Sequence, residues 1–353
     1  MNDHFQTPND GQRVRLCQSP PVQPLESAVP ERGAPGAQQA IALAALMMGA
    51  IGIGSSGIFV RLSETGPVAT AFWRGALALP FLAIWALIEA RRGRMGGSRA
   101  PHSGGFDVRL LWAGIFFAGD LGLWHWSLLE TSVAASTLEA NLAPIAVTLI
   151  AWVIWRERPS RGFLAALACA VAGVVLIMIP QLGHETARAS PPLPHGIAGH
   201  ALSGNLLGLA TAWFYAGYLL VIARLRASRG AGNVMLWVTL VFTVLLLPVA
   251  LTEHFLPHSP RGWAYLLGLA LIAQLFGQGL IAYALAQLPA TFGSVGLYVQ
   301  PIAAAVFAWL LLGERLTRVQ IVGALVVLGA IALARRAQAA RSSRPARSAP
   351  APS

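Results

Sequence analysis

The sequence contains no lysine, and only 11% of its 353 residues carry a charged side chain. Soluble globular domains average about 25% charged residues, so a soluble protein of this composition would leave apolar surface in water. Without lysine there is no Gly-x-x-x-x-Gly-Lys phosphate-binding loop, and nucleotide-driven pumping by this chain alone is not expected. Cysteine is scarce too: Cys17 lies in a polar segment and Cys169 in an apolar one, which predicts neither a disulfide framework nor a metal cluster.

Hydrophobic residues, in contrast, make up 56% of the chain. A bilayer tolerates such a composition because the outside of a membrane protein can itself be apolar. The net charge of +11 would suit a nucleic-acid-binding protein if the basic residues clustered on one polar face. Here the arginines lie between and after long apolar stretches, so the expected partner is the lipid bilayer and no nucleic acid is expected.

Ten apolar segments predict an all-α integral membrane protein with ten transmembrane helices. A spanning helix needs about 20 mainly apolar residues, and short links such as Glu130–Val133 force neighbouring helices to run antiparallel. The predicted helices are Ile41–Val60, Val68–Ile88, Leu110–Leu129, Ala134–Trp155, Phe163–Ile179, Leu206–Ile222, Val234–Leu251, Ala264–Leu285, Thr291–Leu312 and Ile321–Ala334.

The same pattern divides the chain into two five-helix units, residues 40–180 and 206–336. Residues 181–205 are predicted to form an external linker between them. Residues 1–38 and 337–353 are Pro-rich or Arg-, Ala- and Ser-rich, and they are predicted to be disordered tails.

Arginine placement predicts the orientation of the chain in the membrane. With the N-terminus inside, most arginines fall in inner loops and tails, and the outer loops hold only Arg61, Arg188, Arg261, Arg315 and Arg318. Cytoplasmic loops carry the basic excess, so both termini are expected to be cytoplasmic. Basic residues supplied by arginine alone are typical of a bacterium with a GC-rich genome, and the expected location is the bacterial inner (plasma) membrane.

An internal repeat is the most specific signal in the sequence. A shift of 157 residues places Pro144-Ile145-Ala146 on Pro301-Ile302-Ala303, and Glu157-Arg158 on Glu314-Arg315. Each unit has an odd number of helices, so the second unit enters the membrane from the opposite side. Such an inverted-topology repeat predicts a substrate site near the midplane, between the two halves.

The segment Leu312-Gly313-Glu314-Arg315-Leu316 resembles the Gly-Glu-Arg ending of the fourth helix of an EamA domain, and Trp155-Arg156-Glu157-Arg158 does so less closely, with Arg156 in place of glycine. Ala69–Ala76 is similar to that family's second helix. On these motifs the chain, between residues 40 and 336, resembles two EamA domains of the drug/metabolite transporter superfamily. The resemblance implies a ten-helix carrier that moves metabolites or drugs, without fixing the substrate.

Ionisable side chains inside a bilayer are costly and are functional candidates by default. Arg74, Asp120, His125 and Glu139 are in this class. They favour a polar centre that binds a charged or zwitterionic substrate or exchanges a proton with it, since burial and neighbours can bring Asp and His into the range of proton exchange. The alternative is an Arg–carboxylate pair that only fixes helix packing, and Glu139 can also lie at the solvated interface.

Polar stripes on two helix faces add further substrate-binding candidates. Residues three or four apart share a face, so Thr137, Asn141 and Pro144 form a stripe. The shift of 157 residues maps this stripe onto Ser294, Tyr298 and Pro301. Each proline also frees a carbonyl one turn earlier. The stripes predict opposite walls of one cavity, and interhelical packing is the alternative.

Gln274, Gln278, Tyr283 and Trp124 complete the substrate-binding prediction, with lipid contact or packing as the alternative for the aromatic residues. Aromatic side chains can flank a flat or cationic substrate. Glu157 and Glu314 are interpreted as forming local ion pairs with neighbouring arginines at helix ends.

The predicted function is a secondary transporter, with export of a small metabolite or drug by alternating access. No catalytic residues, cofactor or metal are expected, and transport is expected either to be coupled to protons or to run downhill. The alternatives are a membrane-embedded enzyme, for which no His-Glu-x-x-His motif or nucleophile elbow is present, and a non-transporting scaffold or sensor. The sequence does not determine the oligomeric state.

Overall fold

The computed structural model describes residues 36–95, 106–155, 160–182, 201–226, 229–287 and 293–342. Within these ranges the chain is helical with short connections and contains no β-strand, which confirms the all-helical part of the fold prediction. The helices are α1 (Gly36–Gly54), α2 (Ser56–Leu62), α3 (Pro67–Met95), α4 (Val108–Glu130), α5 (Val133–Ala140), α6 (Ala143–Trp155), α7 (Arg161–Leu182), α8 (Ala201–Arg226), α9 (Ala231–Ala250), α10 (Pro260–Gly268), the π-helical η2 (Leu269–Gly277), α11 (Gln278–Gln287), α12 (Gly293–Leu312) and α13 (Arg318–Ser342).

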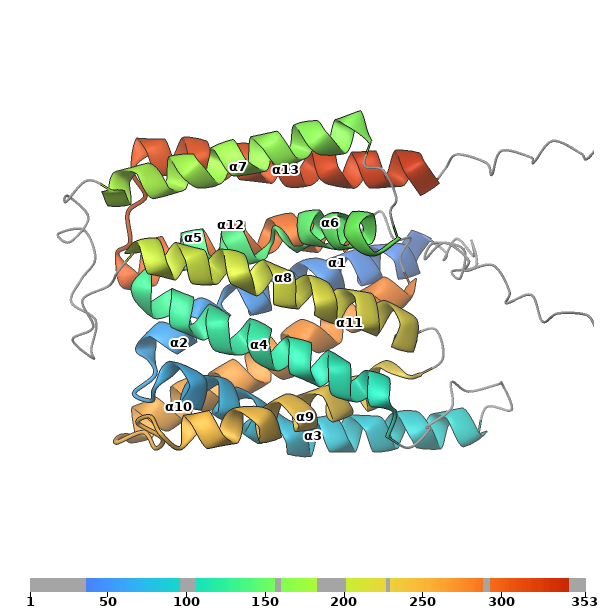
Figure 1. The fold of residues 1–353 in the computed structure, drawn as a ribbon. Helices are drawn as coiled ribbons and strands as arrows, with labels where there is room; N and C mark the ends of the chain where they lie inside the picture. The colour runs from blue at the N-terminus through green and yellow to red at the C-terminus, as the bar shows by residue number, and fades with distance from the viewer. Residues whose placement is uncertain are drawn as a thin grey trace, which may run out of the picture.

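The helices run along one common direction, and the chain passes back and forth between the two ends of the bundle (Figure 1). Helix α1 begins and α13 ends at the same end, on the right of the view. We call this the Glu89 end, because Glu89 lies close to it on α3. The opposite end carries the α2–α3 and α9–α10 connections, and we call it the Glu64 end after the residue between α2 and α3.

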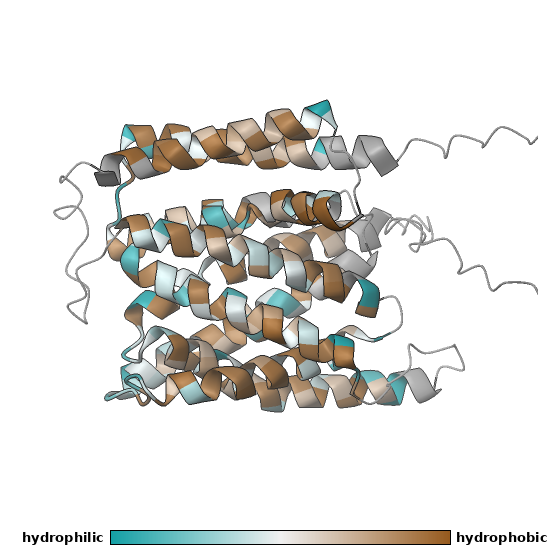
Figure 2. Cartoon of the chain, viewed as in Figure 1, coloured by the Kyte–Doolittle hydropathy of each residue, from teal (hydrophilic) through white to brown (hydrophobic). Residues whose placement is uncertain are grey.

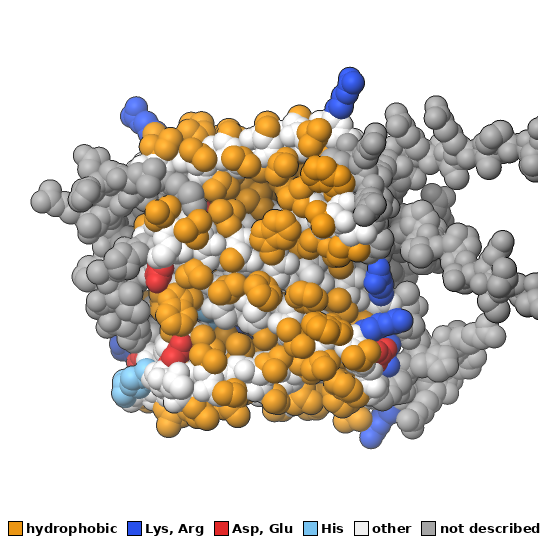
Figure 3. Space-filling view, viewed as in Figure 1, with side chains coloured by type: hydrophobic (Ala, Val, Ile, Leu, Met, Phe, Trp, Pro, Cys, Tyr) orange, Lys and Arg blue, Asp and Glu red, His pale blue; other side chains and the backbone are white. Residues whose placement is uncertain are grey.

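Six helical stretches among the described residues are long and apolar enough to cross a membrane. They are Ala40–Leu62, Pro67–Arg92, Val133–Ile154, Ala201–Ile222, Ala231–Ala250 and Pro260–Ile281. Figure 2 shows apolar residues along the length of the helices, and Figure 3 shows an apolar surface with charged side chains gathered toward the two ends. This distribution is that of a multi-pass membrane protein, because lipid meets the middle of the bundle and water meets its ends.

The helix predicted over Ala134–Trp155 is interrupted in the structure, where α5 ends at Ala140 and α6 begins at Ala143. Proline has no N–H, and its ring clashes with the carbonyl four residues earlier. For Pro144 that carbonyl belongs to Ala140, the last residue of α5. The observed effect of Pro144 is therefore larger than the predicted one, a freed carbonyl, because the helix ends there and a new helix begins.

Several helices extend beyond their predicted ends, among them α8 and α13. Helix α8 begins at Ala201, inside the predicted linker 181–205, and α13 continues to Ser342, inside the predicted tail 337–353. The start of α8 is held by α4, since the Ser203 hydroxyl donates to Glu130 and the Thr131 hydroxyl donates to Asn205. Alanine, glutamine and arginine at the end of α13 are strong helix formers. Residues 1–35 and 343–353 lie outside the described residues.

Helices α3 and α9 pack against each other in antiparallel directions. At the Glu64 end, the Glu253 carboxylate accepts hydrogen bonds from the backbone N–H groups of Val68 and Ala69, both at 2.9 Å. These N–H groups are unsatisfied within α3 because they belong to its first turn. Glu253 therefore caps the start of α3 from the end of α9.

The Glu89 end of the same helix pair repeats this contact. The Glu89 carboxylate accepts from the N–H groups of Gly232 at 2.9 Å and Asn233 at 3.3 Å. Glu253 follows Glu89 by 164 residues, and the two N–H donors of α9 follow those of α3 by the same 164 residues. The shift differs from the 157 residues that relate the later helices, because the connections within the two halves differ in length.

Candidate functional site

A cavity of about 60 Å³ lies near the middle of the bundle, between helices of the first half (residues 40–180) and of the second half (residues 206–336). Asp120 lines it, twelve residues after the start of α4 and ten before its end. A cavity of this size holds a few water molecules. Its lining residues are Ile53, Arg74, Phe117, Asp120, Leu121, Trp124, Thr137, Ala140, Asn141, Tyr215, Gln278 and Gln300.

Arg74 is the cationic group of the cavity wall, and its side chain is only 2% exposed. Its Nε–H group donates to Oε1 of Gln274 at 2.9 Å, and Gln274 in turn donates through Nε2 to the Thr239 hydroxyl at 3.2 Å. Gln274 lies in η2 and Thr239 in α9, so the second half orients a guanidinium that the first half supplies. This hydrogen bond uses Nε alone and leaves the two terminal nitrogens for a ligand.

Asp120 places the opposite charge on the same cavity and is 8% exposed. In the part of the chain that the structure describes, Asp120 and Arg74 do not form an ion pair, and the two described ion pairs are Arg61–Glu314 and Arg229–Asp107. The predicted acidic partner of Arg74 therefore shares its cavity without closing onto it. Two opposite charges on one cavity favour a ligand that carries both.

Three neutral polar atoms of the cavity wall have no hydrogen-bond partner among the described residues. They are Nε1 of Trp124, Oγ1 of Thr137 and Oδ1 of Asn141, all buried. Asn141 follows the last residue of α5 and donates through Nδ2 to the carbonyl of Thr137 at 2.7 Å, which leaves its amide oxygen unused. Leaving a buried polar atom unpaired costs about 1–3 kcal/mol, and a bound ligand or water removes that cost.

Aromatic side chains form another part of the wall. Phe117 and Tyr215 line the cavity, and each stacks against Tyr218, with ring centroids 4.6 and 5.9 Å apart respectively. Trp213 is 49% exposed and does not belong to this group. Stacked rings at the contact of α4 with α8 supply an apolar surface beside the charged one.

The structure brings six of the predicted substrate-binding candidates to this cavity: Arg74, Asp120, Trp124, Thr137, Asn141 and Gln278. Gln274 belongs to it indirectly, through its hydrogen bond to Arg74. Gln300 lines the cavity and was missed by the sequence prediction, although a lone glutamine before Pro301 in an apolar stretch is a visible signal.

The other predicted residues lie elsewhere. His125 is buried, with Nδ1 at 3.2 Å from the Pro67 carbonyl, and Glu139 is buried on the face of α5 that meets α8. Tyr283 is 47% exposed on α11. Pro144 is buried at the start of α6 without lining the cavity. Side chains at similar depths in the membrane therefore point in different directions. Their depth alone does not predict which of them reach the cavity.

Pro301 lines a second, apolar cavity of about 190 Å³. This cavity lies among α5, α7, α12 and α13, away from Arg74 and Asp120. Asn141 and Pro301 therefore line two different cavities, and the structure does not bring these two members of the predicted stripes to one cavity. The side chains of Ser294 and Tyr298 lie outside the described residues.

Three carboxylates tie the two halves together at the Glu64 end. Each accepts from backbone N–H groups near the start of a helix in the other half: Glu253 at α3, Glu64 at α10 and Glu314 at α5. The exposed N–H groups and the partial positive charge of a helix start both favour a carboxylate there.

The Glu64 carboxylate accepts from the N–H of His258 at 2.8 Å, from the N–H of Ser259 at 2.9 Å and from the Ser259 hydroxyl. The hydroxyl bond is the largest influence and lowers the pKa of Glu64 below its ordinary value. Burial acts in the opposite direction on Glu253, and it raises the pKa of that carboxyl against the two hydrogen bonds from α3.

Glu314 corrects one prediction. Its ion pair is with Arg61 of α2, at 3.4 Å, and not with a neighbouring arginine, and Arg61 is buried in a helix and not placed in an outer loop. Gly313 adopts a left-handed φ of 68° after the end of α12, which glycine tolerates without strain. Burial raises the pKa of Glu314, and the charge of Arg61 opposes that shift.

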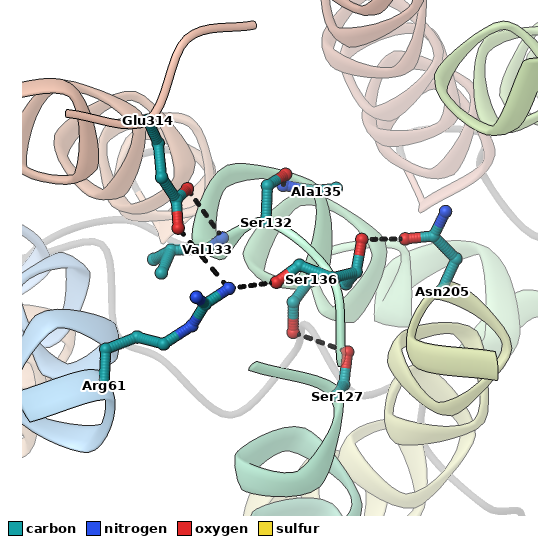
Figure 4. A network of polar contacts seen from close by, with 9 residues as sticks. Arg61, Ser127, Ser132, Val133, Ala135, Ser136, Asn205 and Glu314 are labelled. Atoms are coloured by element: carbon teal, nitrogen blue, oxygen red, sulfur yellow. Dashed lines mark hydrogen bonds and ion pairs between the residues drawn. The ribbon is translucent and has the colours of Figure 1, made fainter. Parts of the chain in front are cut away.

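Figure 4 shows this contact as part of a larger polar network. The Glu314 carboxylate also accepts from the N–H of Val133 at 3.1 Å, and Nη2 of Arg61 also donates to the Thr131 carbonyl. The network therefore joins the end of α12 to the α4–α5 connection. Glu157, the predicted counterpart of Glu314, lies outside the described residues.

A bundle of apolar helices around a buried polar cavity, with carboxylates that tie two halves together, is the arrangement of a multi-pass membrane transporter. The sequence matches the model of the EamA-like transporter family over residues 39–179 and again over residues 202–336. The chain belongs to the EamA-like transporter family.

Two relatives illustrate the range of the family. The chain is 24% identical over 284 residues to an uncharacterized transporter of Archaeoglobus fulgidus, covering 78% of this chain and 91% of the relative. It is also 24% identical over 227 residues to the pseudopaline exporter CntI of Pseudomonas aeruginosa, covering 64% and 74% of the two chains. The first relative is named as a transporter and the second as an exporter.

A solved crystal structure shares the fold, with a TM-score of 0.52 over 88% of this chain and 100% of that chain. The sequence identity is 14%, so this likeness concerns the fold alone.

Proposed function

We propose that this chain is a secondary transporter that exports a small zwitterionic metabolite, such as an amino acid derivative, by alternating access. The observation that carries the proposal is the central cavity between the two halves, where Arg74 and Asp120 place opposite charges on one cavity without a direct ion pair between them among the described residues. Buried charges without partners are costly, and a ligand that brings both complementary charges offsets that cost.

The cavity chemistry suggests how such a ligand binds. The terminal nitrogens of Arg74 are suited to a carboxylate, which a guanidinium can hold through two parallel hydrogen bonds. Asp120 and the free amide oxygen of Asn141 are suited to an ammonium group. The indole N–H of Trp124 and the Thr137 hydroxyl then serve polar groups of the side chain.

The proposed architecture is ten spans in two inverted halves. In this assignment α1 with α2, α5 with α6, and α10, η2 and α11 together each form one span, and each other helix forms one. The equivalent contacts of Glu89 and Glu253 support the inversion, because they relate the halves by exchanging the two ends of the bundle.

The carboxylate contacts between the two halves suggest how alternating access works. A carrier opens one end at a time, and here each end has its own carboxylate contacts between the halves. Releasing Glu253, Glu64 and Glu314 opens the Glu64 end, and releasing Glu89 opens the Glu89 end. The two sets of contacts lie at opposite ends, so keeping one set while the other is released exposes the cavity to one side at a time.

We place the protein in the bacterial inner membrane with both termini in the cytoplasm, so that the Glu64 end faces outward. The arginine distribution of the sequence supports this orientation. Export is supported by the relative named as a pseudopaline exporter. The proposal needs no cofactor or catalytic residue, and its partners are the lipid bilayer and the small-molecule substrate, with transport coupled to protons or running downhill.

The test is thermal unfolding of the purified protein with separate panels of amino acids, nucleosides, sugars and lipophilic cations. A ligand that binds only the folded state stabilises it by about 2.7 kcal/mol at a hundredfold its Kd. We expect a zwitterionic amino acid or derivative to raise the unfolding temperature, and Asp120→Asn and Arg74→Met to abolish that rise. Asp107→Asn is the matched control, because Asp107 is a carboxylate at the start of α4 that lies outside the cavity.

A rise with another class of ligand, or one that survives both cavity variants, would contradict the zwitterion proposal. If no panel raises the unfolding temperature, the non-transporting scaffold becomes the better account. The ligand identified in this way is then loaded into proteoliposomes to measure transport.

A further inference from the structure

Glu139 is a buried carboxyl that the central cavity does not use. It is fully buried on α5, and neither of its oxygens has a hydrogen-bond partner among the described residues. Thr137 and Asn141 on the same stretch line the cavity. Glu139 lies two residues from each of them, which is about 200° around a helix, so its side chain lies on the opposite face from the cavity.

The room for this carboxyl comes from a glycine on α8. A Cβ atom on Gly208 would overlap Oε2 of Glu139 and would lie 3.3 Å from the Ser127 hydroxyl. The absence of a side chain at position 208 therefore allows the carboxyl to lie directly against the backbone of α8. Any larger residue there would displace it.

Buried hydroxyl groups lie between this position and the start of α5 at the Glu64 end, and Figure 4 draws Ser136 and Ser127 among them. Ser136 lies three residues before Glu139 on α5, and its hydroxyl is hydrogen-bonded to that of Ser127 at 2.8 Å. One turn further along α4, the Thr131 hydroxyl donates to Asn205 at 2.6 Å. These groups are buried, and the Ser127 hydroxyl also donates to the Gly204 carbonyl at 2.7 Å, so polar groups follow one another along an otherwise apolar helix contact.

This row of polar groups ends at the contact between the two halves. The carbonyl of Thr131 accepts from Arg61, which forms the ion pair with Glu314. A change in charge at Glu139 is therefore connected, through α5 and Thr131, to one of the contacts that close the Glu64 end.

The described surroundings of Glu139 provide no compensating charge. Helix α5 packs against α2, α4, α8, α12 and α13. No described hydrogen bond or ion pair joins Glu139 to any titratable group of these helices. Those groups, among the residues described, are Arg61, Arg109, Asp120, His125, Glu130, Tyr215, Tyr218, Arg224, Arg318 and Arg336.

From these contacts we infer that Glu139 is the proton-binding site of the transporter, separate from the substrate cavity, and that it exchanges its proton with the Glu64 end along the Ser136–Ser127–Thr131 track. A buried ionised carboxylate without a partner costs several kcal/mol. Addition of one proton converts the carboxylate to a neutral carboxylic acid and removes that cost. This inference rests on the proposed function, and it assigns the proton to the face of α5 opposite the substrate.

The inference is tested by infrared spectroscopy of the purified protein in lipid, which distinguishes the carbonyl stretch of a carboxylic acid from that of a carboxylate. The spectra of the unaltered protein are compared with those of Glu139→Gln, Asp120→Asn and Glu130→Gln while the pH is raised. We expect one carboxylic-acid band to be lost in Glu139→Gln and retained in both control variants. Glu130 is the matched control because its carboxylate is already hydrogen-bonded, to Trp126 and Ser203.

The same band should disappear from the unaltered protein as the pH rises, and Ser127→Ala should slow its exchange in deuterated water. If Glu139→Gln does not fold, Gly208→Ala replaces it, because a methyl group against the carboxyl must shift the band of Glu139 and leave the others in place. Loss of no band in Glu139→Gln, or no shift in Gly208→Ala, would overturn the inference. The measurement needs no substrate, so its outcome is independent of whether the ligand panels identify one.

Discussion

Glu89 and Glu253 make the same contact at opposite ends of one helix pair. Each carboxylate accepts from two consecutive backbone N–H groups at the start of the partner helix, and the two contacts are related by a shift of 164 residues. A carboxylate at a helix start typically contributes about 0.3–1 kcal/mol through the helix dipole. The two contacts are chemically alike. The relative stability of the closed Glu64 end and the closed Glu89 end therefore depends on the residues around each contact.

The first prediction concerns this balance. We expect Glu253→Gln to weaken closure of the Glu64 end and Glu89→Gln to weaken closure of the Glu89 end, because an amide keeps the shape of the carboxylate without its charge. The measurement is the rate at which thiol reagents modify Ser63→Cys or Asn233→Cys in a background without the native cysteines. The rate at Ser63→Cys should rise in Glu253→Gln only, and the rate at Asn233→Cys in Glu89→Gln only.

Equal effects of both substitutions at both positions would contradict this prediction, because they would indicate a general loss of packing. Asp107→Asn is a further comparison: its carboxylate caps its own helix, and its ion pair of 3.8 Å with Arg229 also joins the two halves at the Glu89 end, so its effect should be confined to Asn233→Cys.

The second prediction concerns the buried ion pair between Arg61 and Glu314, whose side chains are 7% and 9% exposed. Removing one partner of a buried pair leaves the other charge uncompensated and costs about 3–5 kcal/mol. We therefore expect Arg61→Met to lower the free energy of unfolding by roughly that amount, and the double variant with Glu314→Gln to recover part of the loss. Denaturant unfolding in detergent measures both. A double variant less stable than Arg61→Met alone would show that the pair is not the source of the loss.

The third prediction is a pH dependence of stability with opposite signs at two carboxyls. The pKa of Glu64 is lowered in the folded protein by the Ser259 hydroxyl, so its contribution is present above the ordinary carboxyl pKa and is lost as the pH falls through the lowered value. The pKa of Glu253 is raised by burial, so its contribution is complete below the ordinary value and is lost as the pH rises through the raised one.

Unfolding temperatures measured from acidic to neutral pH check this prediction. Ser259→Ala should reduce stability on the neutral side and leave the acid side unchanged. Glu253→Gln should remove the loss that accompanies rising pH. Identical profiles for the two variants and the unaltered protein would contradict the assignment of both groups.

The fourth prediction concerns the orientation of Arg74. Gln274→Leu removes the acceptor of the Arg74 Nε–H group and the donor to the Thr239 hydroxyl. We expect it to cost about 1–3 kcal/mol of stability, since it leaves a buried donor unpaired, and to weaken binding of the ligand found in the panels. Thr239→Val is the control, because it disturbs Gln274 without removing the bond to Arg74. Unchanged ligand binding in Gln274→Leu would remove Gln274 from the site.

Composition and periodicity were sufficient to predict the helical membrane fold, because a charge deficit combined with long apolar segments is incompatible with a water-exposed surface. The same reasoning found Arg74 and Asp120, since a charge inside an apolar segment is visible without a structure. The break between α5 and α6 was underestimated, because the disruption at Pro144 depends on whether the preceding turn can be capped, as it is by Asn141.

The sequence could not predict which side chains contact each other across the bundle. Depth along a helix can be counted, but the direction of a side chain depends on helix rotation and on the neighbouring helix. For this reason Asn141 lines the cavity while Glu139, two residues before it, meets α8. The partner of Glu314 was wrongly predicted for the same reason, since Arg61 lies 253 residues earlier in the chain.

The small volume of the central cavity has a consequence for ligand affinity. A space of about 60 Å³ is far below the 300–1,000 Å³ of an ordinary ligand pocket. The proposed zwitterionic substrate therefore binds a rarer, expanded form of the protein, and its apparent affinity is reduced by the fraction of molecules in that form. Substitutions far from the cavity that make expansion easier would then tighten binding of every compound that uses this form by the same factor. Affinity would rise, while the ranking of compounds, which the lining residues determine, would stay the same.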